Sequence, residues 1–144
     1  MPVFVDTNVL VYARDASEPD KQALARVWMS ALWASREGRL STQVLNEYYV
    51  TVTRKLTPAM PAPQARADVR DLCAWQPTVI DAHVLAQAWE VEERFGLSYW
   101  DALIVAAAQT ANCDHLLTED VSDGQQLGSV RVVNPFAHTP DSLL

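Results

Sequence analysis

Four carboxylates, Asp6, Glu47, Asp101 and Asp120, stand where metal-assisted chemistry is expected. Asp6 directly follows the apolar run Val3–Val5, and Asp120 follows a second run that ends at Thr118. The carboxyl ends of parallel strands meet at one edge of a sheet, which is where such sheets bind ligands. Converging carboxylates repel one another unless cations or protons neutralise them, and Mg²⁺ favours oxygen ligands of this kind. A bound cation can activate water and stabilise a scissile phosphate, so the implied reaction is phosphodiester hydrolysis.

Each of these acids also has an ordinary structural explanation, and the residues alone leave both readings open. Asp6 is well placed to cap a helix beginning near Thr7. Asp101 completes the pattern Ser98-x-x-Asp101, a variant of the capping box at a helix start. Asp120 lies in a turn-like segment, 118–124, and Glu47 lies off the apolar stripe of its helix, where a charged residue is normally solvated.

The elements that must position these acids alternate between short apolar runs and longer helical patterns, which predicts an α/β fold on a mostly parallel sheet. We expect one domain, residues 1–144, because the length and the 49% apolar content suit a single core. The expected strands are 3–5, 78–80, 115–118 and 130–133. The expected helices are 20–36, 42–56, 64–74, 82–95 and 102–111, with a proline-rich loop at 57–63.

The apolar spacing also predicts which helix faces are buried. In the helix 20–36 the expected stripe is Leu24, Val27, Trp28, Ala31 and Leu32. In the helix 42–56 it is Val44, Leu45, Tyr48, Tyr49, Val52 and Leu56. The helix 102–111 is apolar on nearly all sides, so it should be the most buried helix.

The charge and the cysteines bound the class of protein. The formal net charge is −7, the opposite of the basic surplus that general nucleic-acid binders use to neutralise phosphates. A phosphate-bearing substrate would therefore be held by local arginines and by bound cations. The two cysteines form no disulfide framework and no zinc pattern, which favours a reducing, cytoplasmic setting. No apolar run approaches the length needed to span a bilayer.

Two functions of other classes compete with nuclease chemistry. A haloacid-dehalogenase-like phosphatase starts with a strand and Asp-x-Asp, but the third position here is Asn8. It also needs a downstream lysine, whereas the only lysines are Lys21 and Lys55, and the same point argues against a receiver domain. A non-catalytic binding domain with an acidic rim remains the second alternative. The four glycines form neither a phosphate-binding loop nor a dinucleotide fingerprint.

Four segments together resemble the PIN-domain ribonucleases, particularly the VapC-type toxins of bacterial toxin-antitoxin pairs. They are Phe4-Val5-Asp6-Thr7-Asn8-Val9-Leu10, Ser41-Thr42-Gln43-Val44-Leu45-Asn46-Glu47, Leu97-Ser98-Tyr99-Trp100-Asp101-Ala102-Leu103-Ile104 and Leu116-Leu117-Thr118-Glu119-Asp120. The likeness spans nearly the whole chain. It implies a three-layer PIN-like domain, with about five short, mostly parallel strands flanked by helices.

The resemblance also implies the site and the partners. Asp6, Glu47, Asp101 and Asp120 would bind one or two Mg²⁺ or Mn²⁺ ions and activate water to cut single-stranded RNA regions, leaving a 5′-phosphate. Thr7 or Asn8 would help order the site, and Ser98 would support Asp101. The expected partners are an RNA substrate, a cognate VapB-like antitoxin and a second copy of the chain in a homodimer, with no membrane.

The family often places an aromatic residue shortly after its fourth acid, but this chain continues Val121-Ser122-Asp123-Gly124, so Glu119 or Asp123 could share or replace the role of Asp120. The candidates for RNA phosphate contacts are Arg14, near the first helix, and the pair Arg54 and Lys55 beyond Glu47.

Overall fold

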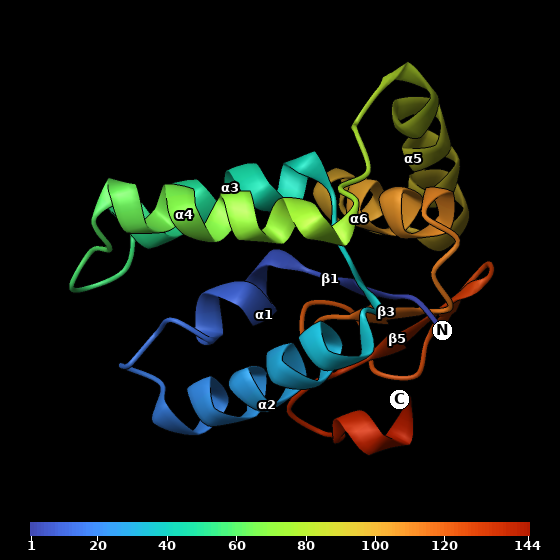
Figure 1. Ribbon diagram of the computed structural model, residues 1–144. Helices are drawn as coiled ribbons and strands as arrows, with labels where there is room; N and C mark the ends of the chain where they lie inside the picture. Colours follow the sequence, from blue (N-terminus) through green and yellow to red (C-terminus); the bar gives the residue numbers. More distant parts are fainter.

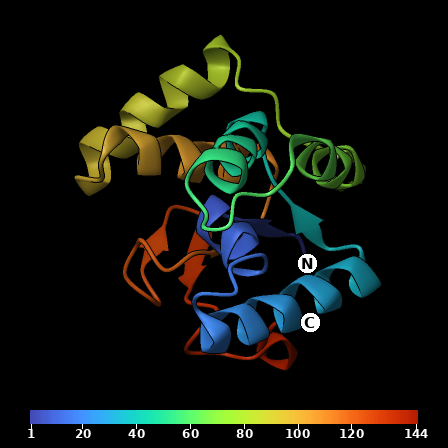
Figure 2. The same ribbon diagram turned by 90° about the vertical axis from the view of Figure 1, so that its left-hand side faces the viewer.

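The computed structural model describes residues 1–144 and has three layers. Figure 1 and Figure 2 show the sheet in the middle, with α3, α4 and α6 over one face and α2 with the C-terminal turn over the other. The strands are β1 (Val3–Val5), β2 (Gly38–Arg39), β3 (His115–Leu117), β4 (Gln126–Leu127) and β5 (Val130–Val133). The helices are α1 (Thr7–Tyr12), α2 (Pro19–Ser35), α3 (Thr42–Arg54), α4 (Ala62–Leu72), α5 (Ala82–Phe95) and α6 (Tyr99–Thr110), with short 3₁₀ turns η1 (Cys73–Trp75) and η2 (Pro140–Ser142).

The five strands lie in the order β2-β1-β3-β5-β4, and only the edge strand β4 is antiparallel to its neighbour. This confirms the predicted fold class. Strand β1 is buried throughout, and β3 and β5 are buried except at His115 and Arg131, which explains why their sequences are mostly apolar. The side-by-side pairing of Val5 with Leu117 brings the carboxyl ends of β1 and β3 together.

The strand predicted at 78–80 is wrong. Thr78 makes one isolated parallel bridge with Ser41, and no strand forms around it. Strands β2 and β4 were not predicted, because two residues carry no alternating pattern. The loop at 57–63 is shorter than expected: α4 already begins at Ala62, and Pro61 stands at its N-cap, since proline is tolerated at a helix start.

The predicted core faces hold for two helices and fail for part of a third. Seven consecutive residues of α6, 102–108, are buried, as expected for the most apolar helix. The α3 stripe is buried or partly buried throughout. In α2, however, Leu24 and Val27 are exposed, and the face that enters the core carries Ala25, Trp28 and Leu32.

A side-chain cap fixes the start of α3, the helix that carries Glu47. Ser41 caps α3, since its hydroxyl accepts a hydrogen bond from the Val44 N–H at 3.3 Å.

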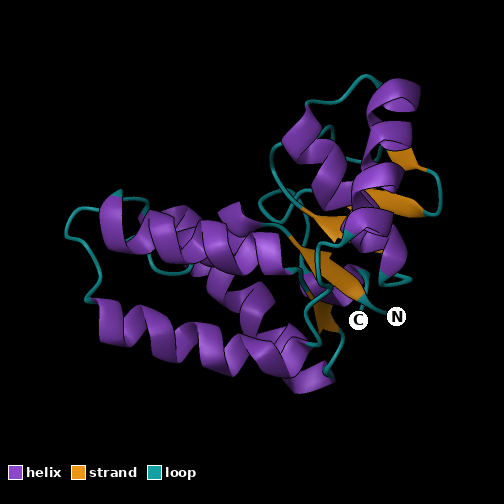
Figure 3. Cartoon of the chain, turned by 90° about the horizontal axis from the view of Figure 1, so that it is seen from above, coloured by secondary structure: helices purple, strands orange, loops and turns teal.

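Seen from above in Figure 3, α3 and α4 form an antiparallel pair whose connecting loop lies at the end away from the sheet. Helix α5 packs chiefly on α6. No helix is both long enough and apolar enough to cross a membrane.

Candidate active site

Asp6 is anchored by both its backbone and its side chain at the end of β1. Its backbone N–H extends the ladder to β3 by donating to the Leu117 carbonyl at 3.0 Å. Its carboxylate caps α1, because Oδ1 accepts from the Thr7 N–H at 2.7 Å. The capping role and the site role proposed for Asp6 are therefore compatible, since Oδ2 remains for other contacts.

A polar network joins the ends of β1 and β3, and consists of Asp6, Asn8, Thr118 and Asp120. The Thr118 hydroxyl donates to Asp6 Oδ2 at 2.8 Å. The Asn8 side-chain amide lies 3.2 Å from Asp6 Oδ2, 3.1 Å from Thr118 Oγ1 and 3.0 Å from Asp120 Oδ2. The Asp120 N–H donates to Thr118 Oγ1 at 3.1 Å, which fixes the loop after β3. One amide thus holds two carboxylates of distant sequence position together.

Burial and neighbouring charge disfavour the ionised form of Asp6. Its side chain is only 6% exposed. The pKa of Asp6 is raised to about 7, chiefly by burial; the hydrogen bonds from Thr118 and Thr7 lower it, and the charges of Asp120 and Glu47 add to the rise. A carboxyl with this pKa changes charge near neutral pH, and a cation bound beside it would restore the ionised form.

The other two acids lie at the margin of this network. On α3, the protein packed around Glu47 raises the pKa of its carboxyl, and the charges of Asp101 and Asp120 raise it further. Asp101 lies in the first turn of α6, where the Ser98 hydroxyl accepts its N–H at 3.2 Å. Burial raises the pKa of Asp101 most, and Asp120 adds to the effect. Asp120 therefore acts electrostatically on all three other acids, and we call Asp6, Glu47, Asp101 and Asp120 the acidic cluster.

The residues present suit a hard divalent cation. Their donors are carboxylate oxygens, and the Asn8 Oδ1 and Thr7 Oγ1 atoms are buried without a hydrogen-bond partner. No three acidic or histidine side chains lie together as a ready-formed metal cage. Asp6 and Asp120, the two acids joined by the Asn8 amide, are the pair that could hold Mg²⁺, which is usually bound by one or two carboxylates with water and substrate phosphate completing its shell.

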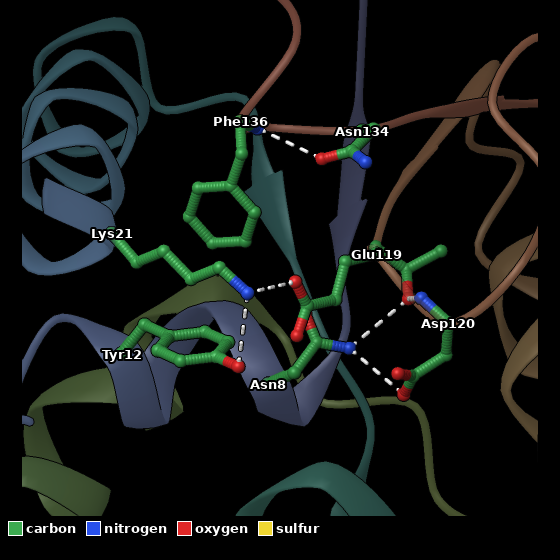
Figure 4. Close-up of polar contacts among 8 residues, drawn as sticks. Asn8, Tyr12, Lys21, Glu119, Asp120, Asn134 and Phe136 are labelled. Atoms are coloured by element: carbon green, nitrogen blue, oxygen red, sulfur yellow. Dashed lines mark hydrogen bonds and ion pairs between the residues drawn. The ribbon is translucent and has the colours of Figure 1, made fainter. Parts of the chain in front are cut away.

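The two rival fourth acids point elsewhere. Figure 4 shows the Glu119 carboxylate turned to Lys21, whose Nζ lies 2.9 Å from Oε2, while Asp120 meets Asn8. Asp123 accepts the Asn134 N–H at 2.9 Å and contacts His138 Nε2 at 2.8 Å. These two contacts lower the pKa of Asp123. Of the three candidates, only Asp120 joins the network around Asp6.

The basic residues predicted to contact RNA phosphates differ in whether an acidic side chain already pairs with them. Arg14 is paired with Asp68, at 3.1 Å from Nε to Oδ2 and 2.7 Å from Nη2 to Oδ1, and Tyr48 also donates to Asp68. This pair lines a pocket of about 320 Å³ beside α1, α2, α3 and α4, rather than the acidic cluster. Arg54 and Lys55 are exposed at the end of α3, and the Lys55 charge acts on Glu47.

Thr118 is the member of the network to which sequence reasoning gave no role. Its hydroxyl is fully buried and contacts Asp6, Asn8 and Asp120. The sequence feature that could have identified Thr118 is a hydroxyl residue directly after a buried strand and two positions before Asp120. Lys21, Tyr12 and Phe136 were missed as well, because their meeting depends on three separate segments.

Comparison with known proteins gives a family. The model of the PIN domain matches residues 3–122, most of the chain. The chain belongs to the PIN-domain family. This PIN domain has no match among curated protein sequences. The matched range contains all four members of the acidic cluster.

Solved structures share the fold of this PIN domain. A toxin-antitoxin complex from Klebsiella pneumoniae has a TM-score of 0.65 at 20% identity, covering 94% of this chain and 98% of that one. VapC20 of Mycobacterium tuberculosis, a toxin that cleaves the Sarcin-Ricin loop, has a TM-score of 0.63 at 24% identity, covering 90% and 98%. FitAB bound to a DNA fragment has a TM-score of 0.70 at 20% identity, covering 93% and 95%. At these identities the likeness is one of fold.

Proposed function

We propose that this PIN domain is a metal-dependent endoribonuclease and the toxin of a VapBC-type toxin-antitoxin pair. The observation that carries the proposal is the network in which Asn8 and Thr118 hold Asp6 beside Asp120, whose charge also acts on Glu47 and Asp101. Family membership and a shared fold with toxins of this kind support it.

In this proposal, Asp6, Asp120, Glu47 and Asp101 hold one or two Mg²⁺ or Mn²⁺ ions. A bound ion would lower the pKa of a water molecule and stabilise negative charge on the scissile phosphate. Asn8 and Thr118 orient the carboxylates, Thr7 fixes Asp6 through its N–H, and Ser98 fixes the first turn of α6. Such supporting contacts govern metal sites nearly as strongly as the ligands do.

The RNA would be held mainly by the metal and by a few local cations, since the whole chain is acidic. Arg54 and Lys55 are the favoured phosphate contacts, because no acidic side chain pairs with either of them. Arg14 is the weaker candidate, as Asp68 already occupies its guanidinium. The partners proposed with this function are a VapB-like antitoxin and a second copy of the chain, acting in the cytoplasm.

The deciding experiment incubates the purified protein with structured RNAs, with Mg²⁺, with Mn²⁺ or with EDTA. We expect cleavage only with a divalent cation, products bearing a 5′-phosphate, and loss of cleavage in Asp6→Asn and Asp120→Asn. Asp71→Asn, an exposed acid on α4, is the matched control and should cut normally.

Other outcomes would reject the proposal in favour of a named alternative. Equal cutting by Asp6→Asn would refute the metal site. Turnover of a small phosphomonoester without RNA cutting would indicate a phosphatase. Binding of an antitoxin without either activity would indicate an interaction module. Co-purification with the antitoxin and light scattering of the free protein test the two partners separately.

A further inference from the structure

Two acidic residues stand side by side after β3, and they face opposite ways. Asp120 reaches Asn8 at 3.0 Å, within the polar network. Glu119 instead reaches Lys21, whose ammonium group comes from α2, nearly a hundred positions earlier in the chain. Because Glu119 and Asp120 are adjacent and carry the same charge, either carboxylate could belong to the acidic cluster. Another contact must therefore determine which of the two does.

Lys21 is held by more than its ion pair. Its Nζ lies 3.4 Å from the Tyr12 hydroxyl and 4.8 Å from the centroid of the Tyr12 ring. It also lies 5.2 Å from the centroid of the Phe136 ring, and these two rings meet edge to face at 5.3 Å. Cation–π contacts of this kind favour the charged ammonium in a partly buried place.

Tyr12 and Phe136 are each held in place by the part of the chain to which they belong. Tyr12 ends α1, the helix that Asp6 caps. Phe136 follows β5, and its N–H donates to Asn134 Oδ1 at 2.9 Å (Figure 4). The side chain of Lys21 is 38% exposed and that of Glu119 is 22% exposed, so the carboxylate is the better shielded partner. Four segments of the chain therefore meet around one ion pair.

We infer that Lys21 is a positioning residue, which holds Glu119 against Tyr12 and Phe136 and so leaves Asp120 as the acid that enters the cluster. The inference rests on the proposed function for its kinetic readout, but its metal-binding readout does not. Without Lys21, the Glu119 carboxylate has no cationic partner and can compete with Asp120 for Asn8 or for the cation.

The test compares Lys21→Met, Glu119→Gln and the double variant, with Lys21→Arg as the conservative variant. Lys21→Met leaves an unbranched side chain one atom shorter and removes its charge. Arg26→Met is the matched control, because it removes one positive charge from the same helix and its guanidinium contacts the Ala13 carbonyl rather than Glu119. Calorimetry measures Mn²⁺ binding in the absence of RNA, and RNA cleavage gives kcat and KM.

For Lys21→Met we expect Mn²⁺ to bind about threefold to tenfold more tightly, since a carboxylate is released beside the site. We expect kcat to fall about tenfold with KM little changed, because the added acid disturbs the productive arrangement. Glu119→Gln alone should stay within about twofold of wild type, and in the double variant both effects should disappear. Lys21→Arg should keep the pairing and the activity.

This pattern separates positioning from two simpler roles. A purely structural link would weaken Mn²⁺ binding and lower the melting temperature, and Glu119→Gln would not restore either property. A general charge effect would tighten Mn²⁺ binding in Arg26→Met as well and leave kcat unchanged. Unchanged kcat in Lys21→Met, or a double variant as slow as Lys21→Met, would overturn the inference. If the wild type binds Mn²⁺ and cuts no RNA, the proposed function fails while the binding arm still tests Lys21.

Discussion

The side-chain amide of Asn8 donates to Asp120 Oδ2 at 3.0 Å across 112 positions of sequence. This contact links the first helix to the loop after β3. The same nitrogen lies 3.2 Å from Asp6 Oδ2, so it stands between two carboxylates that would otherwise repel each other. An amide donor at this point reduces that repulsion without adding charge.

Replacement of Asn8 should therefore disturb both carboxylates at once. We expect Asn8→Ala to lower RNA cleavage and Mn²⁺ affinity by roughly 10–100-fold, the usual cost of removing a residue that orients metal ligands. Initial cleavage rates and calorimetric titration measure the two effects. Asn46→Ala, an exposed asparagine on α3, is the control and should change neither. Wild-type metal affinity in Asn8→Ala would contradict the bridging role.

Asp6→Asn should remove activity but raise the free energy of unfolding of the metal-free protein. The pKa of Asp6 is about 7 in the folded state against 3.8 for an aspartate in water, so the folded protein binds more protons between these values. Stability is therefore lost as the pH rises from about 4 to 7, by up to about 4 kcal/mol. Asp6→Asn carries no such loss, and its gain over wild type should grow over this range and stay constant above it.

Thermal or urea unfolding in EDTA at pH 5, 6, 7 and 8 measures this gain. The variant should be most stabilised relative to wild type at pH 7 and 8, where it is also inactive. A gain that is the same at pH 5 and pH 8 would show that the charge of Asp6 does not cause it.

Cation binding should depend on pH for the same reason. A cation must displace the proton of Asp6, so Mn²⁺ affinity should fall by about tenfold for each pH unit below 7 and level off above it. Calorimetry at pH 5.5, 6.5, 7.5 and 8.5 tests this, and buffers of different ionisation enthalpy count the released protons. Asp123→Asn is a useful control, because the pKa of Asp123 is already lowered by its own hydrogen bonds. Affinity that is flat with pH would mean that Asp6 is not a ligand.

Of the basic residues predicted to contact RNA, Arg14 should contribute to stability and Lys55 to RNA binding. Arg14→Gln breaks the pair with Asp68, and we expect a loss of about 1 kcal/mol in the free energy of unfolding. Lys55→Gln should leave stability unchanged, raise KM for RNA severalfold and reduce the salt dependence of binding. Melting curves and KM at two salt concentrations distinguish the two cases. A normal melting temperature with a raised KM in Arg14→Gln would return Arg14 to the RNA contacts.

Long apolar patterns in the sequence were sufficient to predict most of the fold. The runs at β1, β3 and β5 and the stripe of α3 are set by burial, which sequence periodicity reports directly. Strands β2 and β4 were not predicted, because two residues have no period. Residues 78–80 were predicted as a strand, but Thr78 makes only one bridge. In α2, Val27 is apolar and exposed, so composition alone could not identify the buried face.

The strand ends that bring Asp6 and Asp120 together were predictable from the sequence, and the hydrogen bonds between them were not. The ends of buried strands pointed to Asp6 and Asp120, since parallel topology brings those ends together. The choice between Asp120 and Glu119 depends on Lys21, whose position is set by the packing of α2 against other segments. Such long-range pairs leave no local trace in the sequence.

The order of the strands also governs when the site can exist during synthesis. The Asp6 carboxylate receives a hydrogen bond from Thr118, 112 positions later. Synthesis produces β1 first, and its partner β3 and the loop bearing Asp120 follow more than a hundred residues later. A nascent chain shorter than this has no acidic cluster, and a product terminated early has none either. Under the proposed function, a nascent chain can therefore cut RNA only after residues 118–120 have been synthesised and have joined Asp6.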